Sequence, residues 1–170
     1  MNQIEVFEEI DAPPEVVWDV LLEFESYPEW NPFVRAIEGE PTEGERLRVQ
    51  IDPPNSRGMT FKPEVIAVEE NRRLVWLGRL VVPFAFDGYH EFHLEPIEDG
   101  ERSGGSRSTS ESDSDGGESS EARRTRLLHR ETFRGALVPL LFDQESLEAG
   151  FAAMNAAVKK RAEARVEATK

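Results

Sequence analysis

The chain has 170 residues, no cysteine and a formal net charge of −14 at pH 7. This length is typical of a single domain with a sizeable core. The lack of cysteine excludes disulfides, thiolate nucleophiles and cysteine-ligated metals. The acidic surface should repel nucleic acid and anionic membranes. No run approaches the roughly 18 apolar residues of a membrane span, and the first ten residues lack signal-peptide regions. We therefore expect a soluble, cytoplasmic protein without stable membrane insertion.

The acidic excess is spread along the chain. Residues 98–124 contain eight acids and four arginines, a net charge of −4, so the remainder carries −10. One interpretation is a generally solubilising surface. The other is halophilic adaptation, because salt screens the repulsion between neighbouring acids and makes a high acid load tolerable.

The first expected elements are a strand and a helix. Residues 4–10 (IEVFEEI) alternate between apolar and polar side chains, as a strand does. From Pro13 onward the period becomes helical, and proline suits a first helical turn because that turn needs no backbone donors. The recurring apolar positions of this helix are Val16, Val17, Val20, Leu21 and Phe24.

The heptapeptide YPEWNPF follows at residues 27–33. Its two prolines cannot lie inside a long helix, so we expect at most one short helical turn. Asn31 is suited to bonding the local backbone and holding this turn. Rigid apolar faces are provided by Tyr27, Trp30 and Phe33.

Residues 33–96 have the pattern of several strands separated by turn signals, and residues 125–133 (TRLLHRETF) resume it. Between them, residues 98–124 contain no aromatic and almost no aliphatic side chains, so nothing offsets the entropy of ordering. We expect a disordered acidic Ser/Gly-rich insert between the last two strands of one domain spanning residues 1–170. Such a loop lengthens at little cost because closure entropy grows logarithmically.

The C-terminal segment, residues 137–168, is predicted to be the longest helix. An apolar stripe recurs along it at intervals of three and four residues, and the opposite face is charged. The stripe must therefore pack against the sheet. It consists of Leu147, Phe151, Met154, Val158, Ala162 and Val166.

The order of elements, together with four stretches of sequence, resembles the START-like, Bet v 1-like SRPBCC superfamily, and within it the polyketide cyclase/dehydrase and lipid transport group. The stretches are residues 10–34, 72–96, 125–141 and 151–164. The resemblance covers nearly the whole chain outside the acidic insert. It implies an α+β helix-grip fold, in which a curved antiparallel sheet of about seven strands wraps around the long C-terminal helix. Two short helices follow the first strand.

The resemblance also gives the aromatic heptapeptide a place. In similar proteins the corresponding segment closes one end of an internal cavity. Tyr27, Trp30 and Phe33 therefore either plug that end or gate a ligand, and the two roles are compatible.

Strand alternation predicts which side chains line the cavity, because the more apolar face of each strand should look inward. If residues 86–96 and 125–135 form a hairpin, His90 lies almost opposite Glu131, and Gly78 leaves room beside them. The inward set from the sheet is Trp76, Gly78, His90, Phe92, His129, Glu131 and Phe133.

A paired, partly buried imidazole and carboxylate stabilise each other or act as a proton-transfer pair. His90, His129 and Glu131 are therefore candidate catalytic residues. The alternative is that they hold the structure or orient a ligand.

On the C-terminal helix, Phe151, Met154 and Asn155 are expected to border the same cavity. Methionine suits an adaptable binding wall but is also ordinary core. Gly150 is expected to permit close approach between the helix and a strand.

We expect neither a metal nor a cofactor. His90 and His93 are three residues apart, so a strand points them to opposite faces and they are poor joint ligands. The sequence has no Gly-rich phosphate loop and no nucleophile signature.

The leading functional hypothesis is binding or carriage of a small hydrophobic or aromatic molecule, lipid-like or polyketide-like, in the cavity. The second is a cofactor-independent cyclase or dehydrase that uses the histidine and glutamate side chains. The third is a protein-interaction module, for which the acidic insert is the supporting feature.

Overall fold

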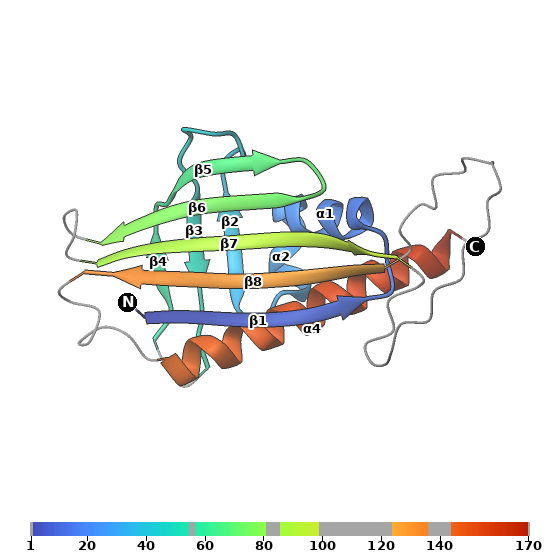
Figure 1. Cartoon of the computed structure of the whole chain (residues 1–170). Helices are drawn as coiled ribbons and strands as arrows, with labels where there is room; N and C mark the ends of the chain where they lie inside the picture. The colour runs from blue at the N-terminus through green and yellow to red at the C-terminus, as the bar shows by residue number, and fades with distance from the viewer. Residues whose placement is uncertain (1, 55–56, 81–85, 99–123, 136–143, 170) are drawn as a thin grey trace, which may run out of the picture.

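The computed structural model describes residues 2–54, 57–80, 86–98, 124–135 and 144–169. Within these ranges the chain has the predicted α+β helix-grip fold, with an antiparallel sheet folded against a long C-terminal helix (Figure 1). None of the described helices is both long and apolar enough to cross a membrane.

The larger sheet has five strands in the order β1-β8-β7-β6-β5, and each neighbouring pair is antiparallel. In chain order these are β1 (Asn2–Ile10), β5 (Glu64–Glu69), β6 (Arg73–Leu80), β7 (Phe86–Ile97) and β8 (Arg124–Arg134).

A smaller antiparallel sheet contains β2 (Val34–Glu38), β3 (Arg48–Ile51) and β4 (Met59–Phe61). The sequence predicted about seven strands in one sheet, whereas the described residues form eight strands in two. Backbone hydrogen bonds such as Leu47 N–H to the Pro63 carbonyl, at 3.0 Å, join the smaller sheet's connecting chain to the start of β5. The two sheets therefore form one bent wall.

Three short helical segments follow β1, where the sequence predicted two. They are α1 (Pro14–Leu22), the 3-10 turn η1 (Phe24–Ser26) and α2 (Tyr27–Trp30). Asn31 holds the chain after α2, because its buried Oδ1 accepts from the backbone N–H groups of Phe33 and Val34. This confirms the local role predicted for the asparagine.

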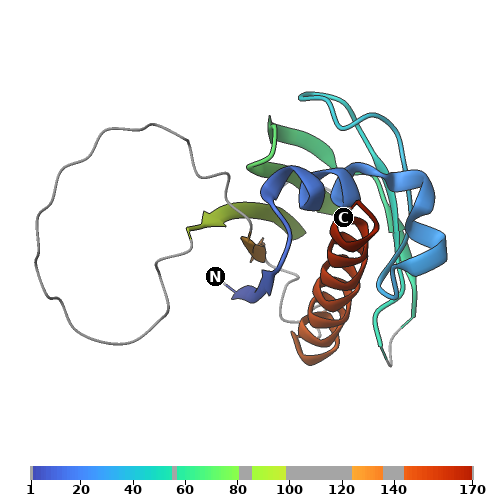
Figure 2. The same ribbon diagram turned by 90° about the vertical axis from the view of Figure 1, so that its right-hand side faces the viewer.

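The long helix α4 (Gln144–Ala168) buries one face in the molecule and exposes the other. Figure 2 shows it between the larger sheet and the layer formed by α1, α2 and the smaller sheet. Residues 137–143 of the predicted helix lie outside the described residues. The predicted apolar stripe is buried at Phe151, Met154, Val158 and Ala162, and partly buried at Leu147 and Val166.

The predicted register is also confirmed. β7 and β8 pair without a bulge from Asp87↔Arg134 to Ile97↔Arg124, and His90 lies directly opposite Glu131. Strands β6 and β7 pair continuously as well. Because no bulge interrupts these three strands, counting alternate residues assigns their inner face correctly.

Gly150 has a different role from the predicted one. A Cβ atom at this position would overlap the ring of Phe33 at Cδ2, so the glycine makes room for an aromatic side chain from the loop before β2. The Phe33 ring also packs edge-on against Phe151, with 5.5 Å between ring centroids. The close approach is therefore to a ring and not to a strand.

We predict that Gly150→Ala destabilises the protein by about 1–3 kcal/mol, the usual cost of overpacking. In an unobstructed helix the same change would stabilise by about 1 kcal/mol. The free energy of unfolding in urea measures the effect. In a Phe33→Ala background the substitution should become neutral or stabilising, and an unchanged penalty there would contradict the explanation.

Most of the acidic segment 98–124, predicted to be a disordered insert within one domain, lies outside the described residues. Its ends are fixed, because Ile97 and Arg124 are paired across β7 and β8. Deletion of residues 100–122 would leave three residues between them, a common hairpin-loop length.

We expect the deleted chain to keep the urea midpoint and the cooperativity of the full chain, because a long flexible loop contributes little to stability. Equilibrium unfolding followed by tryptophan fluorescence measures both. A loss of cooperative unfolding would refute the proposal of a disordered insert in a single domain.

Candidate functional site

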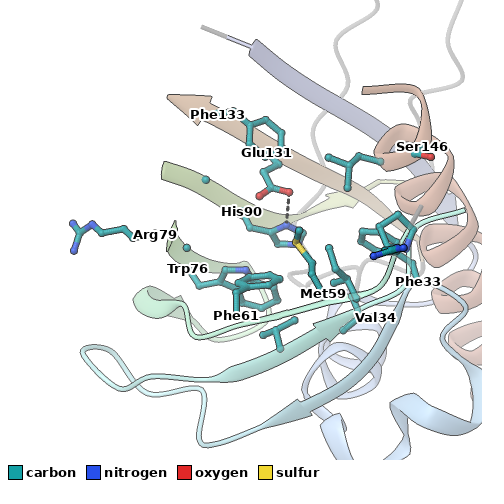
Figure 3. A pocket seen from close by; sticks show the side chains of 17 residues that line it. Phe33, Val34, Met59, Phe61, Trp76, Arg79, His90, Glu131, Phe133 and Ser146 are labelled. Carbon is teal, nitrogen blue, oxygen red and sulfur yellow. Dashed lines mark hydrogen bonds and ion pairs between the residues drawn. The ribbon is translucent and has the colours of Figure 1, made fainter. Parts of the chain in front are cut away.

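The bent wall and the start of α4 enclose a cavity of about 160 Å³ (Figure 3). Its described lining is mostly aliphatic and aromatic. Exposed Arg57 and Met59, together with the half-exposed Arg79, lie where this lining meets the surface. In Figure 3 the side chain of Arg79 points away from the cavity, so the interior holds little charge.

The larger sheet and the loop before β2 supply the part of the lining that the sequence predicted. Six predicted residues are brought together there, namely Phe33, Trp76, Gly78, His90, Glu131 and Phe133.

Five other predicted residues lie in the core beside the cavity and outside its described lining. The β-strand residues Phe92 and His129 and the helix residues Phe151, Met154 and Asn155 are all fully or almost fully buried. These five residues are covered by packing between α4 and the larger sheet, and they contribute to the core rather than to the cavity lining.

Tyr27 and Trp30 also lie outside the described lining. The Tyr27 hydroxyl donates to the Leu21 carbonyl at 2.7 Å, and its ring packs against Trp30. The Trp30 indole donates to Ser26 Oγ, and the Arg161 guanidinium stacks over its ring. These contacts correspond to the plugging role, whereas Phe33 alone of the three reaches the cavity.

Sequence reasoning missed the wall formed by the smaller sheet. This wall consists of Val34, Val49, Ile51, Met59 and Phe61. The alternation in residues 47–51 carried the signal, since Leu47, Val49 and Ile51 share a face. The sequence analysis missed these residues because it expected one sheet, and one sheet forms only one wall of a cavity.

A chain of polar side chains runs from the cavity into the core. Glu131 Oε2 lies 3.3 Å from His90 Nδ1, and His90 Nε2 lies 3.0 Å from His129 Nε2. His129 Nδ1 lies 2.9 Å from Asn155 Oδ1, and Asn155 Nδ2 donates to the Val6 carbonyl at 3.3 Å. The chain therefore links β7, β8, α4 and β1.

Aromatic rings enclose both imidazoles. Trp76 stacks on His90 with 4.6 Å between centroids, and Phe151 stacks on His129 at 3.9 Å. Phe92 packs edge-on against His90 and lies tilted against His129. These rings remove water from the imidazoles, which makes a positive charge there costly.

Burial shifts all three titratable groups toward their neutral forms. It lowers the pKa of His90 to about 3, against a smaller opposing effect of Glu91. Burial, and then the neighbouring His90, hold the pKa of His129 well below its usual value. Burial raises the pKa of Glu131 to about 8. At neutral pH the hydrogen-bonded side chains of Glu131, His90 and His129 therefore carry no net charge.

Two further features shape the site around Glu131. Gly88 leaves space for the carboxyl group, since a Cβ atom there would lie 2.7 Å from Glu131 Oε1. The indole nitrogen of Trp76 is buried and has no hydrogen-bond partner among the described residues. Within the described ranges, no three histidine, aspartate or glutamate side chains converge in a way that could hold a metal ion.

The fold and cavity define a START-like helix-grip protein. Residues 1–168 match the model of the family described as polyketide cyclase/dehydrase and lipid transport, so the chain belongs to this family. No curated protein is similar enough in sequence to count as a match.

Solved structures share the fold at low sequence identity. The aromatase/cyclase Zhui from Streptomyces sp. R1128 is 19% identical, with a TM-score of 0.65, over 97% of this chain and 95% of that one. A START superfamily protein from Mycobacterium smegmatis is 16% identical, with a TM-score of 0.60, over 99% of both chains. Protein CV1439 from Chromobacterium violaceum is 15% identical, with a TM-score of 0.65, over 96% of this chain and 99% of that one.

The raised pKa of Glu131 predicts a decline in stability at mildly alkaline pH. The folded pKa of Glu131, about 8, exceeds the ordinary 4.5. Its contribution to the free energy of unfolding is therefore full below pH 4.5 and is lost as pH rises through 8. The lowered histidine pKa values act in the opposite direction, but only below about pH 6.5. Between pH 7 and 8 the free energy of unfolding should therefore fall by about 1 kcal/mol.

Urea unfolding at several pH values measures this decline. Glu131→Gln mimics the protonated side chain and should flatten the profile between pH 7 and 8. The matched change Glu29→Gln, at an exposed position, should leave the wild-type slope. Equal slopes in the wild type and Glu131→Gln would show that Glu131 is not responsible.

Proposed function

We propose that the protein binds a small, mainly apolar or aromatic molecule in the cavity between its two sheets, as a carrier or receptor does. The observation that carries the proposal is a mostly apolar cavity in which the larger sheet places a paired carboxyl and imidazole, Glu131 and His90. Ligand sites commonly combine such a lining with a few polar groups that fix orientation.

The size of the cavity limits what it can enclose. An apolar cavity of about 150 Å³ holds one benzene molecule, so 160 Å³ accommodates a single ring or a short branched chain. The rest of a larger ligand would extend past Met59 toward the surface. Burial of roughly 250 Å² of apolar surface contributes about 6 kcal/mol before the costs of association.

A second candidate is cofactor-independent proton transfer, as in a cyclase or dehydrase. It is favoured by the Glu131 pKa of about 8, which is close to neutral pH, and by likeness to a protein named an aromatase/cyclase. Against it, a proton passed from Glu131 to His90 would create a buried imidazolium, while burial lowers the His90 pKa to about 3. Binding therefore ranks first.

The third hypothesis, a protein-interaction module, depended on residues 98–124. That segment lies almost wholly outside the described residues, and no contact among the described ones favours this function over ligand binding.

We predict that native mass spectrometry of the protein purified from its host detects a co-purifying small molecule. Ile51→Trp should abolish the adduct, because Ile51 lines the cavity and the larger side chain fills it. Ile66→Trp is the matched control, since Ile66 is exposed on β5. Retention of the adduct in Ile51→Trp would place the ligand elsewhere and refute the proposal.

The same ligand separates the two candidates. If the protein is a carrier, the ligand is recovered unchanged from both the wild type and Glu131→Gln. If it is an enzyme, the ligand is converted by the wild type, and Glu131→Gln slows conversion far more than it weakens binding.

A further inference from the structure

We infer that the cavity selects neutral ligands that donate a hydrogen bond, such as phenols, enols or alcohols, because the buried polar chain ends at the cavity on an acceptor oxygen of Glu131. The inference rests on the proposed binding function and makes its ligand class more specific.

The direction of the chain is fixed at its inner end. The Val6 carbonyl is only an acceptor, so the Asn155 amide nitrogen must face it and donate. Asn155 Oδ1 then faces His129 Nδ1 at 2.9 Å, and this nitrogen must carry a hydrogen. The reverse orientation would place two acceptor oxygens against each other in the core.

The direction passes outward through both imidazoles. A neutral His129 with a hydrogen on Nδ1 has an acceptor at Nε2, so His90 must donate to it from Nε2 over 3.0 Å. His90 Nδ1 is then the acceptor, and Glu131 donates to it from Oε2. Every hydrogen in the chain therefore points away from the cavity.

The cavity end is consequently an acceptor. The carboxyl group of Glu131 faces the cavity, with Oε2 toward His90 (Figure 3), and Oε1 lies above Gly88. If the shared proton moves from Glu131 to His90, the pair stays neutral overall and Oε1 remains an acceptor. The result therefore does not depend on which of the two groups holds the proton.

An acceptor in an apolar cavity discriminates among ligands. A hydroxyl group can donate to Oε1, whereas a hydrocarbon leaves this oxygen without a partner, and a carboxylate presents further acceptors and a charge. A site that bonds a ligand hydroxyl rejects the analogue lacking it more strongly than a purely apolar site does.

The test uses 4-ethylphenol, size-matched 4-ethyltoluene and anionic 4-ethylbenzoate, titrated calorimetrically into the full-length protein at pH 6.5. The quantity compared is the ratio of the Kd for 4-ethyltoluene to the Kd for 4-ethylphenol. This ratio should fall at least about tenfold in Glu131→Met, which has no acceptor oxygen. It should stay within about twofold in Glu131→Gln, whose amide can donate to His90 and keep its oxygen toward the cavity.

Imidazole nitrogen NMR tests the hydrogen-bond chain without any ligand. At pH 7 we expect a hydrogen on Nδ1 of His129 and on Nε2 of His90, with the partly exposed His93 as an internal reference. The opposite tautomers would overturn the inference.

The binding outcomes separate this inference from the proposed function. If 4-ethylphenol and 4-ethyltoluene both bind but their ratio is the same in Glu131→Met, the inference is overturned and the binding function stands. Tighter binding of 4-ethylbenzoate than of 4-ethylphenol also overturns it. If none of the three binds, the proposed function fails, and the inference fails with it.

Discussion

The structure depends on the hydrogen bonding of three buried polar side chains and the partly buried Glu131 across the contact between α4 and the larger sheet. An unpaired polar group in a core costs as much as a strong hydrogen bond contributes, so Asn155, His129, His90 and Glu131 must meet one another with correct geometry. Asn155 is the α4 residue in this network, and it reaches both His129 and the Val6 carbonyl at the observed position of the helix. These hydrogen bonds thereby specify the position of α4 more narrowly than the apolar stripe of the helix could.

The aromatic rings around the chain complete this constraint. Stacking of Trp76 on His90 and of Phe151 on His129 excludes water, and low polarity strengthens each hydrogen bond while penalising any charge. The network is therefore stable in its neutral form. Although the protein has a net charge of −14, the Glu131 carboxyl group at its cavity carries no charge at neutral pH.

Much of this arrangement could be predicted from the sequence because strands β6, β7 and β8 pair without bulges. A regular two-residue period is sufficient to place Trp76, His90 and Glu131 on one face. Bulges do interrupt the β2–β3 and β5–β6 pairings. There the period gives less information, and alternation within a strand does not show which strands pair, so it could not divide the strands between two sheets.

Other features could not be predicted because they depend on which elements pack together. Asn155 could be placed on the face of α4 that borders the sheet, but its contact with His129 requires the rotation and height of the helix. The collision that Gly150 avoids comes from Phe33, more than 100 residues away. Periodicity describes one element at a time and contains no information about such pairs.

The direction of the hydrogen bonds from Glu131 into the core explains why the geometry favours binding over catalysis. A general acid must aim its proton at the substrate, and a general base must pass on the proton it takes. The Glu131 proton is directed at His90, and the second nitrogen of His90 bonds His129 in the core and does not face a substrate. A chain that ends on the Val6 carbonyl can hold a proton in place but has no outlet for it. Such a chain orients a ligand well and moves protons poorly.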